Sequence, residues 1–107
     1  MYVRVDLEYD TVEVSLEQPE DCKQFHVLMA GEGNDTLVAN ALEGAGVGRS
    51  SANPGHVYIN VAAVREMAAG RVGAAWDDDF AGMLAYASSK GWLDESGSAI
   101  EAHIERG

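Results

Sequence analysis

Residues 1–17, MYVRVDLEYDTVEVSLE, alternate between apolar and polar side chains, and this period of two predicts that the fold begins with β-strands. The alternation reverses its phase near Asp10-Thr11, which a single strand cannot do without a turn or a bulge. We therefore predict an antiparallel hairpin that turns at Asp10-Thr11. The expected apolar pairs are Tyr9 with Val12, Leu7 with Val14, and Val5 with Leu16.

Periodicity and capping residues predict the remaining elements. Three helices are expected near 35–44, 61–69 and 77–90. Asn34-Asp35 would cap the first and Asn60 the second, while Gly91 would end the third. Strands are expected over 24–30, 56–61 and 100–105, the last of them at an edge of the sheet. Residues 19–30 also fit a helix, because Cys22, Phe25, His26 and Met29 have helical spacing.

These elements predict a single α+β domain over residues 1–107, with a small, mostly antiparallel sheet packed against three helices. The element order over residues 35–105 resembles that of a winged helix–turn–helix domain, with a wing formed by residues 92–104. The resemblance rests on element order alone. The aromatic and methionine stripe predicts the core, and any part of it left exposed would be an interface: Trp76, Phe80, Met83, Leu84 and Trp92.

The composition excludes several classes of partner. The 107 residues include 18 acidic and seven basic side chains, for a net charge of −11. Such a chain is a poor ligand for nucleic acids and anionic membranes, because both bind through positive charge. Cys22 is the only cysteine, so an intrachain disulfide is impossible and a reducing, cytoplasmic location is expected. No apolar run approaches the ~20 residues of a membrane span.

Two stretches contain candidate binding residues. Residues 44–55, GAGVGRSSANPG, are predicted to form a mobile loop whose Arg49 is suited to grip a carboxylate or phosphate. The alternation over 56–61 places His56, Tyr58 and Asn60 on one strand face, where they form a candidate ligand-binding cluster or a solvated face.

Other patterns point to chemistry only weakly. The Gly-rich stretch 44–50 departs from a Walker loop because it follows a helix and has Arg49 in place of lysine. Asp77-Asp78-Asp79 fits the first turn of a helix better than a cation site. Cys22 and His26 have zinc-ligand spacing only if residues 19–30 are helical. We therefore expect no catalytic residue, no metal site and no cofactor.

The sequence favours a non-catalytic protein-interaction module that binds another protein or self-associates as a homodimer. One alternative is a module that binds a small molecule, or a minor enzyme, using Arg49 and the face of His56, Tyr58 and Asn60. Another is a winged-helix regulator, or a DNA mimic whose negative charge occupies a basic partner. The acidic helix 77–90 weakens the regulator hypothesis, because phosphates would repel it.

Overall fold

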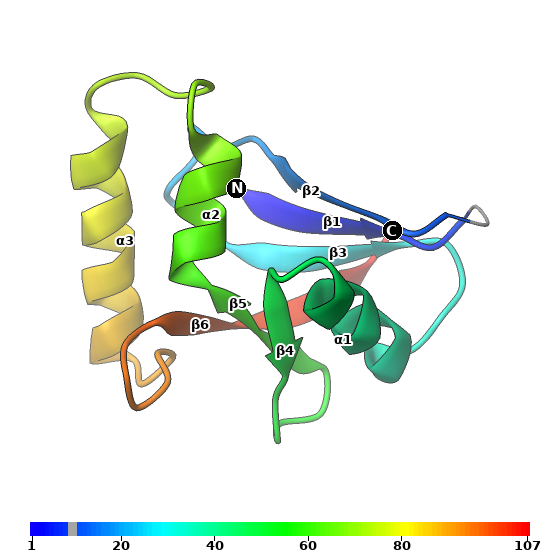
Figure 1. Ribbon diagram of the computed structural model, residues 1–107. Coiled ribbons are helices and arrows are strands. Elements are labelled where there is room, and N and C mark those ends of the chain that lie inside the picture. The colour runs from blue at the N-terminus through cyan, green and yellow to red at the C-terminus, as the bar shows by residue number, and fades with distance from the viewer. Residues whose placement is uncertain (9–10) are drawn as a thin grey trace.

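The computed structural model describes residues 1–8 and 11–107 and contains six strands and three helices within them (Figure 1). The strands are β1 (Tyr2–Asp6), β2 (Glu13–Glu17), β3 (His26–Ala30), β4 (Gly48–Ser50), β5 (His56–Asn60) and β6 (Ala99–Arg106). The helices are α1 (Asp35–Gly44), α2 (Val61–Ala68) and α3 (Trp76–Ser89). Residues 26–30 thus form a strand and the helical alternative for 19–30 is wrong. None of the described helices is long and apolar enough to cross a membrane.

The six strands form one mixed sheet in the order β2-β1-β3-β6-β5-β4. β3 is parallel to both of its neighbours, β1 and β6, whereas the other pairs are antiparallel. The prediction of a small, mostly antiparallel sheet is therefore wrong, although the fold is α+β. Local alternation identifies a strand but carries no information on the direction of its neighbours.

β6 lies in the middle of the sheet, between β3 and β5, and the prediction of an edge strand is wrong. Its polar residues alternate with buried Ile100 and Ala102 because one face of the sheet is polar, not because the strand lies at an edge. Leu93 does bridge to Ile100. The winged-helix comparison nevertheless fails, because a wing is not the central strand of a six-stranded sheet.

The first two strands form the predicted antiparallel hairpin, but in another register. Val5 lies opposite Val14 and Val3 opposite Leu16, so the pairs predicted for Leu7 and for Val5 are wrong by two residues. A shift of two residues keeps every side chain on the same face, so periodicity cannot distinguish the two registers. The predicted pair of Tyr9 with Val12, and Asp10 of the predicted turn, involve residues 9–10, which lie outside the described residues.

Capping explains two of the helix ends. The side chain of Asn34 accepts a hydrogen bond from Leu37 N at 2.9 Å, which confirms the predicted cap of α1. Gly91, at φ +76°, ends α3, and Trp92 N donates to Ala87 O at 2.9 Å in the manner of a Schellman motif. The predicted cap at Asn60 is wrong, since its side chain makes no cap hydrogen bond to α2.

The core lies between one face of the sheet and the helices. In Figure 1, α1 and α2 lie over the sheet and α3 lies beside α2. Phe80 is fully buried and stacks on Trp76 with ring centroids 4.6 Å apart. The strands contribute Val3, Val5, Leu16, Val27, Met29, Val57, Ile59, Ile100 and Ala102. The predicted stripe is thus only partly core: Met83 and Leu84 are half-buried and Trp92 is exposed.

The prediction of one long loop over residues 44–55 is wrong, because β4 lies within this segment. The rest of the segment is held by polar contacts with distant residues. Ser51 Oγ donates to Glu101 at 2.6 Å, and Gly55 N donates to Asp35 at 2.9 Å.

Candidate functional site

All three histidines of the chain lie in one row across the polar face of the sheet. Strand register places Tyr2 beside His26 and His103 beside His56, and the parallel pairing of β3 with β6 brings His26 next to His103. The rings of Tyr2 and His26 stack with centroids 5.0 Å apart, and those of His26 and His103 at 5.9 Å. Four neighbouring strands thus place imidazole and phenol rings side by side.

The carboxylate of Glu105 joins two members of this row. Its two oxygens each lie 3.1 Å from an imidazole Nε2, one from His26 and one from His103. The hydrogen bond with His103 holds the pKa of Glu105 below its ordinary value. Burial lowers the pKa of His26, whose side chain is 18% exposed, although the nearby Glu105 acts in the opposite direction.

The lowered pKa of His26 predicts that acid destabilises the fold. The unfolded chain takes up a proton at His26 near pH 6.5, while the native ring stays neutral to lower pH. The contribution of His26 to the free energy of unfolding is therefore fully present above pH 6.5. It decreases as the pH falls from 6.5 toward the lower pKa of the native ring. Glu105 contributes a further loss below its ordinary pKa of 4.5.

Urea unfolding between pH 7.5 and 5 measures this effect. We expect the midpoint of wild type to fall with the pH, and His26→Gln to show a smaller fall. A variant whose pH dependence matches that of wild type would contradict this role of His26.

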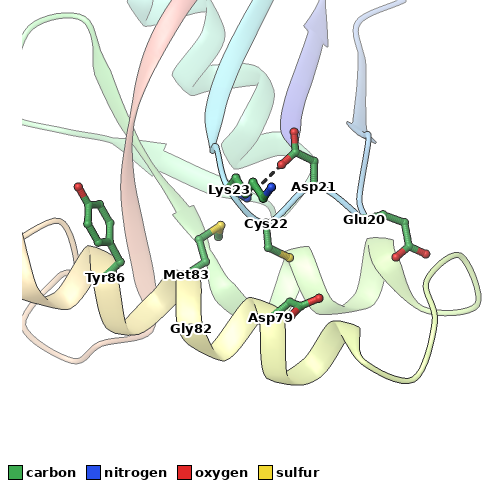
Figure 2. A pocket seen from close by; sticks show the side chains of 8 residues that line it. All are labelled: Glu20, Asp21, Cys22, Lys23, Asp79, Gly82, Met83 and Tyr86. Atoms are coloured by element: carbon green, nitrogen blue, oxygen red, sulfur yellow. Dashed lines mark hydrogen bonds between the residues drawn. The ribbon is translucent and has the colours of Figure 1, made fainter.

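Two pockets adjoin helix α3. The histidine pocket has a volume of about 360 Å³ and is lined by His26, His56, His103, Glu101, Glu105, Ala102, Phe25, Gln24, Lys23, Tyr86 and Trp92. The acidic pocket, drawn in Figure 2, has a volume of about 500 Å³ and is lined by Glu20, Asp21, Cys22, Lys23, Asp79, Gly82, Met83 and Tyr86. Lys23 and Tyr86 line both pockets, and we call the two together the α3 groove.

Two aromatic side chains stand exposed along the groove. Tyr86 is 57% and Trp92 43% exposed, and their rings meet edge to face with centroids 5.7 Å apart. The pair forms because the chain reverses at Gly91, directly after α3, and brings Trp92 back toward Tyr86. Large aromatic surface in a pocket wall is typical of binding sites.

The groove is acidic, and part of this charge has no cationic partner. Five of its residues are carboxylates and one is a lysine. Among the described residues, no salt bridge involves Glu20, Asp79 or Glu101. Glu101 instead accepts hydrogen bonds from Ser51 and from Asn53 Nδ2 at 3.0 Å, and neutral donors leave its negative charge in place.

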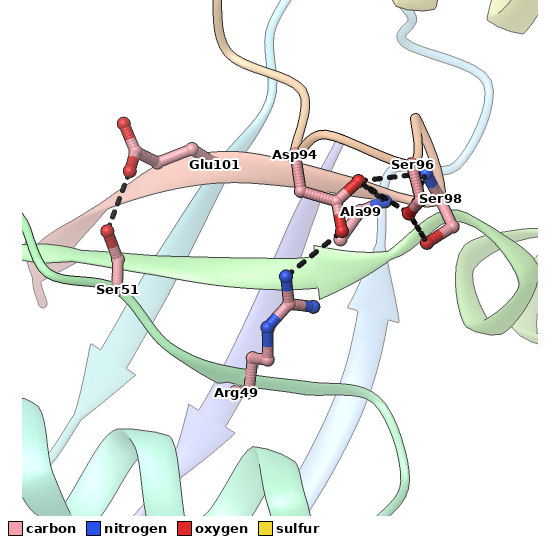
Figure 3. A network of polar contacts seen from close by, with 7 residues as sticks. All are labelled: Arg49, Ser51, Asp94, Ser96, Ser98, Ala99 and Glu101. Carbon is pink, nitrogen blue, oxygen red and sulfur yellow. Dashed lines mark hydrogen bonds and ion pairs between the residues drawn. The ribbon is translucent and has the colours of Figure 1, made fainter.

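The sequence-predicted residues divide between two places. Of these residues, only His56 reaches the histidine pocket. Arg49 lies 4.6 Å over the ring of Tyr58 and forms a 3.0 Å ion pair with Asp94, drawn in Figure 3. Asn60 Nδ2 donates to Gly46 O at 3.4 Å. His56, Tyr58 and Asn60 do share one face of β5, whereas the guanidinium of Arg49 already contacts Tyr58 and Asp94 of the same chain.

The Asp94 carboxylate is the centre of that second network (Figure 3). Besides Arg49, it accepts hydrogen bonds from Ser96 Oγ at 3.0 Å and from the backbone N–H of Ser98 and Ala99. These bonds, led by that with Arg49, outweigh desolvation and lower the pKa of Asp94. The network fixes the turn before β6 and leaves its donors satisfied, so its role is structural.

The proposed link between Cys22 and His26 has no structural basis as a zinc site. Cys22 lines the acidic pocket and His26 the histidine pocket. Burial raises the pKa of the Cys22 thiol, and nearby Asp79 adds to this shift, so the thiol is held in its protonated form. Within residues 1–8 and 11–107, no group of three or more His, Cys, Asp or Glu side chains is arranged to hold a metal ion.

Sequence reasoning missed most of the groove residues. His26 was considered only together with Cys22, His103 was not among the predicted site residues, and Tyr86 was not singled out at all. The histidines share one signal: each occupies the polar parity of its strand. That parity indicates a common face, but only strand order and register show that the three are neighbours.

No protein-family model matches this chain, and neither a curated protein nor a solved structure matches it.

Proposed function

We propose that this protein is a non-catalytic protein-interaction module whose docking surface is the α3 groove. The observation that carries the proposal is the exposed aromatic pair of Tyr86, which lines both pockets, and Trp92, which lines the histidine pocket. Aromatic side chains are enriched at protein interfaces and supply much of their binding energy.

The polar groups of the histidine pocket favour binding over catalysis. Glu105 is shared by His26 and His103, and Glu101 by Ser51 and Asn53. His56 Nδ1 lies 3.0 Å from Pro54 O. Groups paired in this way form a firm floor for a partner, whereas a general base needs a proton acceptor aimed at its substrate.

Charge argues for a different protein as the partner rather than a second copy. Two copies would each bring a net charge of −11 to the interface. The edge strand β2 is also unsuited to self-pairing: antiparallel pairing centred on Ser15 would place Glu13 of one copy opposite Glu17 of the other.

Photo-crosslinking in the cells that make the protein tests this function. A benzophenone amino acid is placed at position 86, in the groove, or at position 66, an exposed position of α2 outside the pockets. We expect position 86 to give an adduct that is heavier than two copies of this chain, and position 66 to give none. Trp92→Ala is expected to reduce the yield of the adduct at position 86. Equal adducts at both positions, or none, would contradict the proposal, and an adduct of two copies would assign the groove to self-association.

A further inference from the structure

We propose that the occupant of the α3 groove is an extended, arginine-bearing segment of a partner protein, with a guanidinium group seated between Trp92 and Glu101. This inference rests on the proposed function and names the chemistry of the partner.

Charge complementarity selects a cationic partner. Glu20, Asp79 and Glu101 have no salt-bridge partner among the described residues. Glu20 and Asp79 line the acidic pocket, and Glu101 lines the histidine pocket. Lys23 lies where the two pockets meet. An extended segment with several positive side chains can therefore meet a carboxylate in each pocket, which a single small cation cannot do.

The aromatic side chains select arginine among cations. The backbone N–H of Glu101 donates to Trp92 O at 2.6 Å, so the two residues are side by side, and both line the histidine pocket. A guanidinium can stack flat on the indole, which an ammonium cannot do in the same way. The oxygens of Glu101 already accept hydrogen bonds from Ser51 and Asn53, so this carboxylate attracts the guanidinium through its negative charge.

The protein already contains this arrangement once within its own chain. The guanidinium of Arg49 lies over the ring of Tyr58 and pairs with the carboxylate of Asp94. Trp92 and Glu101 likewise bring a ring and a negative charge to one pocket, although both oxygens of Glu101 accept hydrogen bonds from Ser51 and Asn53. No described cation of the chain lies over Trp92. Lys90 lies 5.5 Å from the ring centre of Tyr86, so that ring already attracts a cation.

The groove also fits the extended form of the segment. Lys23 and Tyr86 line both pockets and also a small pocket of about 80 Å³ that reaches Trp92 and Glu101. The groove thus continues from the acidic pocket to the histidine pocket along α3. Side chains of an extended chain project alternately, so every second one can enter it.

Titration with a synthetic peptide tests the inference. The probe is an acetylated and amidated peptide in which arginine and glycine alternate, and its matched control carries citrulline, the neutral analogue, at every arginine position. Calorimetry is expected to detect the arginine peptide and to find the citrulline peptide at least about tenfold weaker. Glu101→Gln and Tyr86→Ala are each expected to weaken the arginine peptide by about tenfold.

Two further variants separate the groove from acidic and apolar surface elsewhere on the protein. Glu66→Gln removes an exposed acid outside the groove, and Leu37→Ala removes an exposed apolar side chain on α1, 47% exposed. Both are expected to bind as wild type does. Equal binding of the two peptides, no binding of the arginine peptide, or an equal loss in Glu66→Gln would overturn the inference. A crosslinked partner at position 86 together with no arginine-peptide binding would reject the arginine segment while leaving the proposed function intact.

Discussion

Replacing Phe80 by alanine is expected to remove about 3–5 kcal/mol of folding free energy. The ring is fully buried, stacks on Trp76, and lies beneath the guanidinium of Arg65, whose carbon is 4.9 Å from the ring centre. Its loss leaves a cavity where α2 and α3 meet. Domains of this kind are stable by only about 5–15 kcal/mol, so the variant loses a large part of its stability.

Urea unfolding measures the change, with Tyr86→Ala as the control on the same helix. Tyr86 is 57% exposed, so its replacement is expected to cost less than about 1 kcal/mol. A loss below about 1 kcal/mol for Phe80→Ala would mean that the packing of α3 described here is wrong.

Gly48→Ala is the second substitution with a large expected effect. A Cβ atom at Gly48 would collide with the backbone carbonyl oxygen of Tyr58, and backbone cannot move aside as a flexible side chain can. β4 must then separate from β5 at Gly48 and Ile59, which are paired in the sheet. Overpacking of this kind costs about 1–3 kcal/mol.

Gly44→Ala provides the matched control. A Cβ atom at Gly44, the last residue of α1, meets no atom within 4 Å. Alanine is the better helix former by about 0.8–1 kcal/mol in a helix interior, so this variant is expected to be as stable as wild type or more stable. Equal stabilities of Gly48→Ala and wild type in urea unfolding would contradict the close approach of β4 to β5.

The helices were predictable from sequence because their signals are local. Each signal lies within a few residues of the helix that it marks: Asn34 directly precedes α1, and Gly91 follows closely after α3. Sheet order was not predictable in this way. β1 pairs with β3 and β3 with β6, and these partners come from distant parts of the chain.

The candidate site follows the same division. The parity of His56, Tyr58 and Asn60 was predictable, since a strand repeats every two residues. The row of three histidines depends on the registers of β3, β6 and β5, which alternation does not encode. Trp92 fitted the core stripe by composition, but the turn at Gly91 places it at the surface.

NMR locates the docking site. Backbone amide and indole shifts are mapped as the arginine peptide is added to the isotopically labelled protein. We expect the largest changes at Lys23, Tyr86, the Trp92 indole and Glu101, and little change at Leu37 on α1 and at the buried Trp76 indole. Changes centred on α1 or spread evenly over all acidic surfaces would contradict the claim that the α3 groove is the docking site.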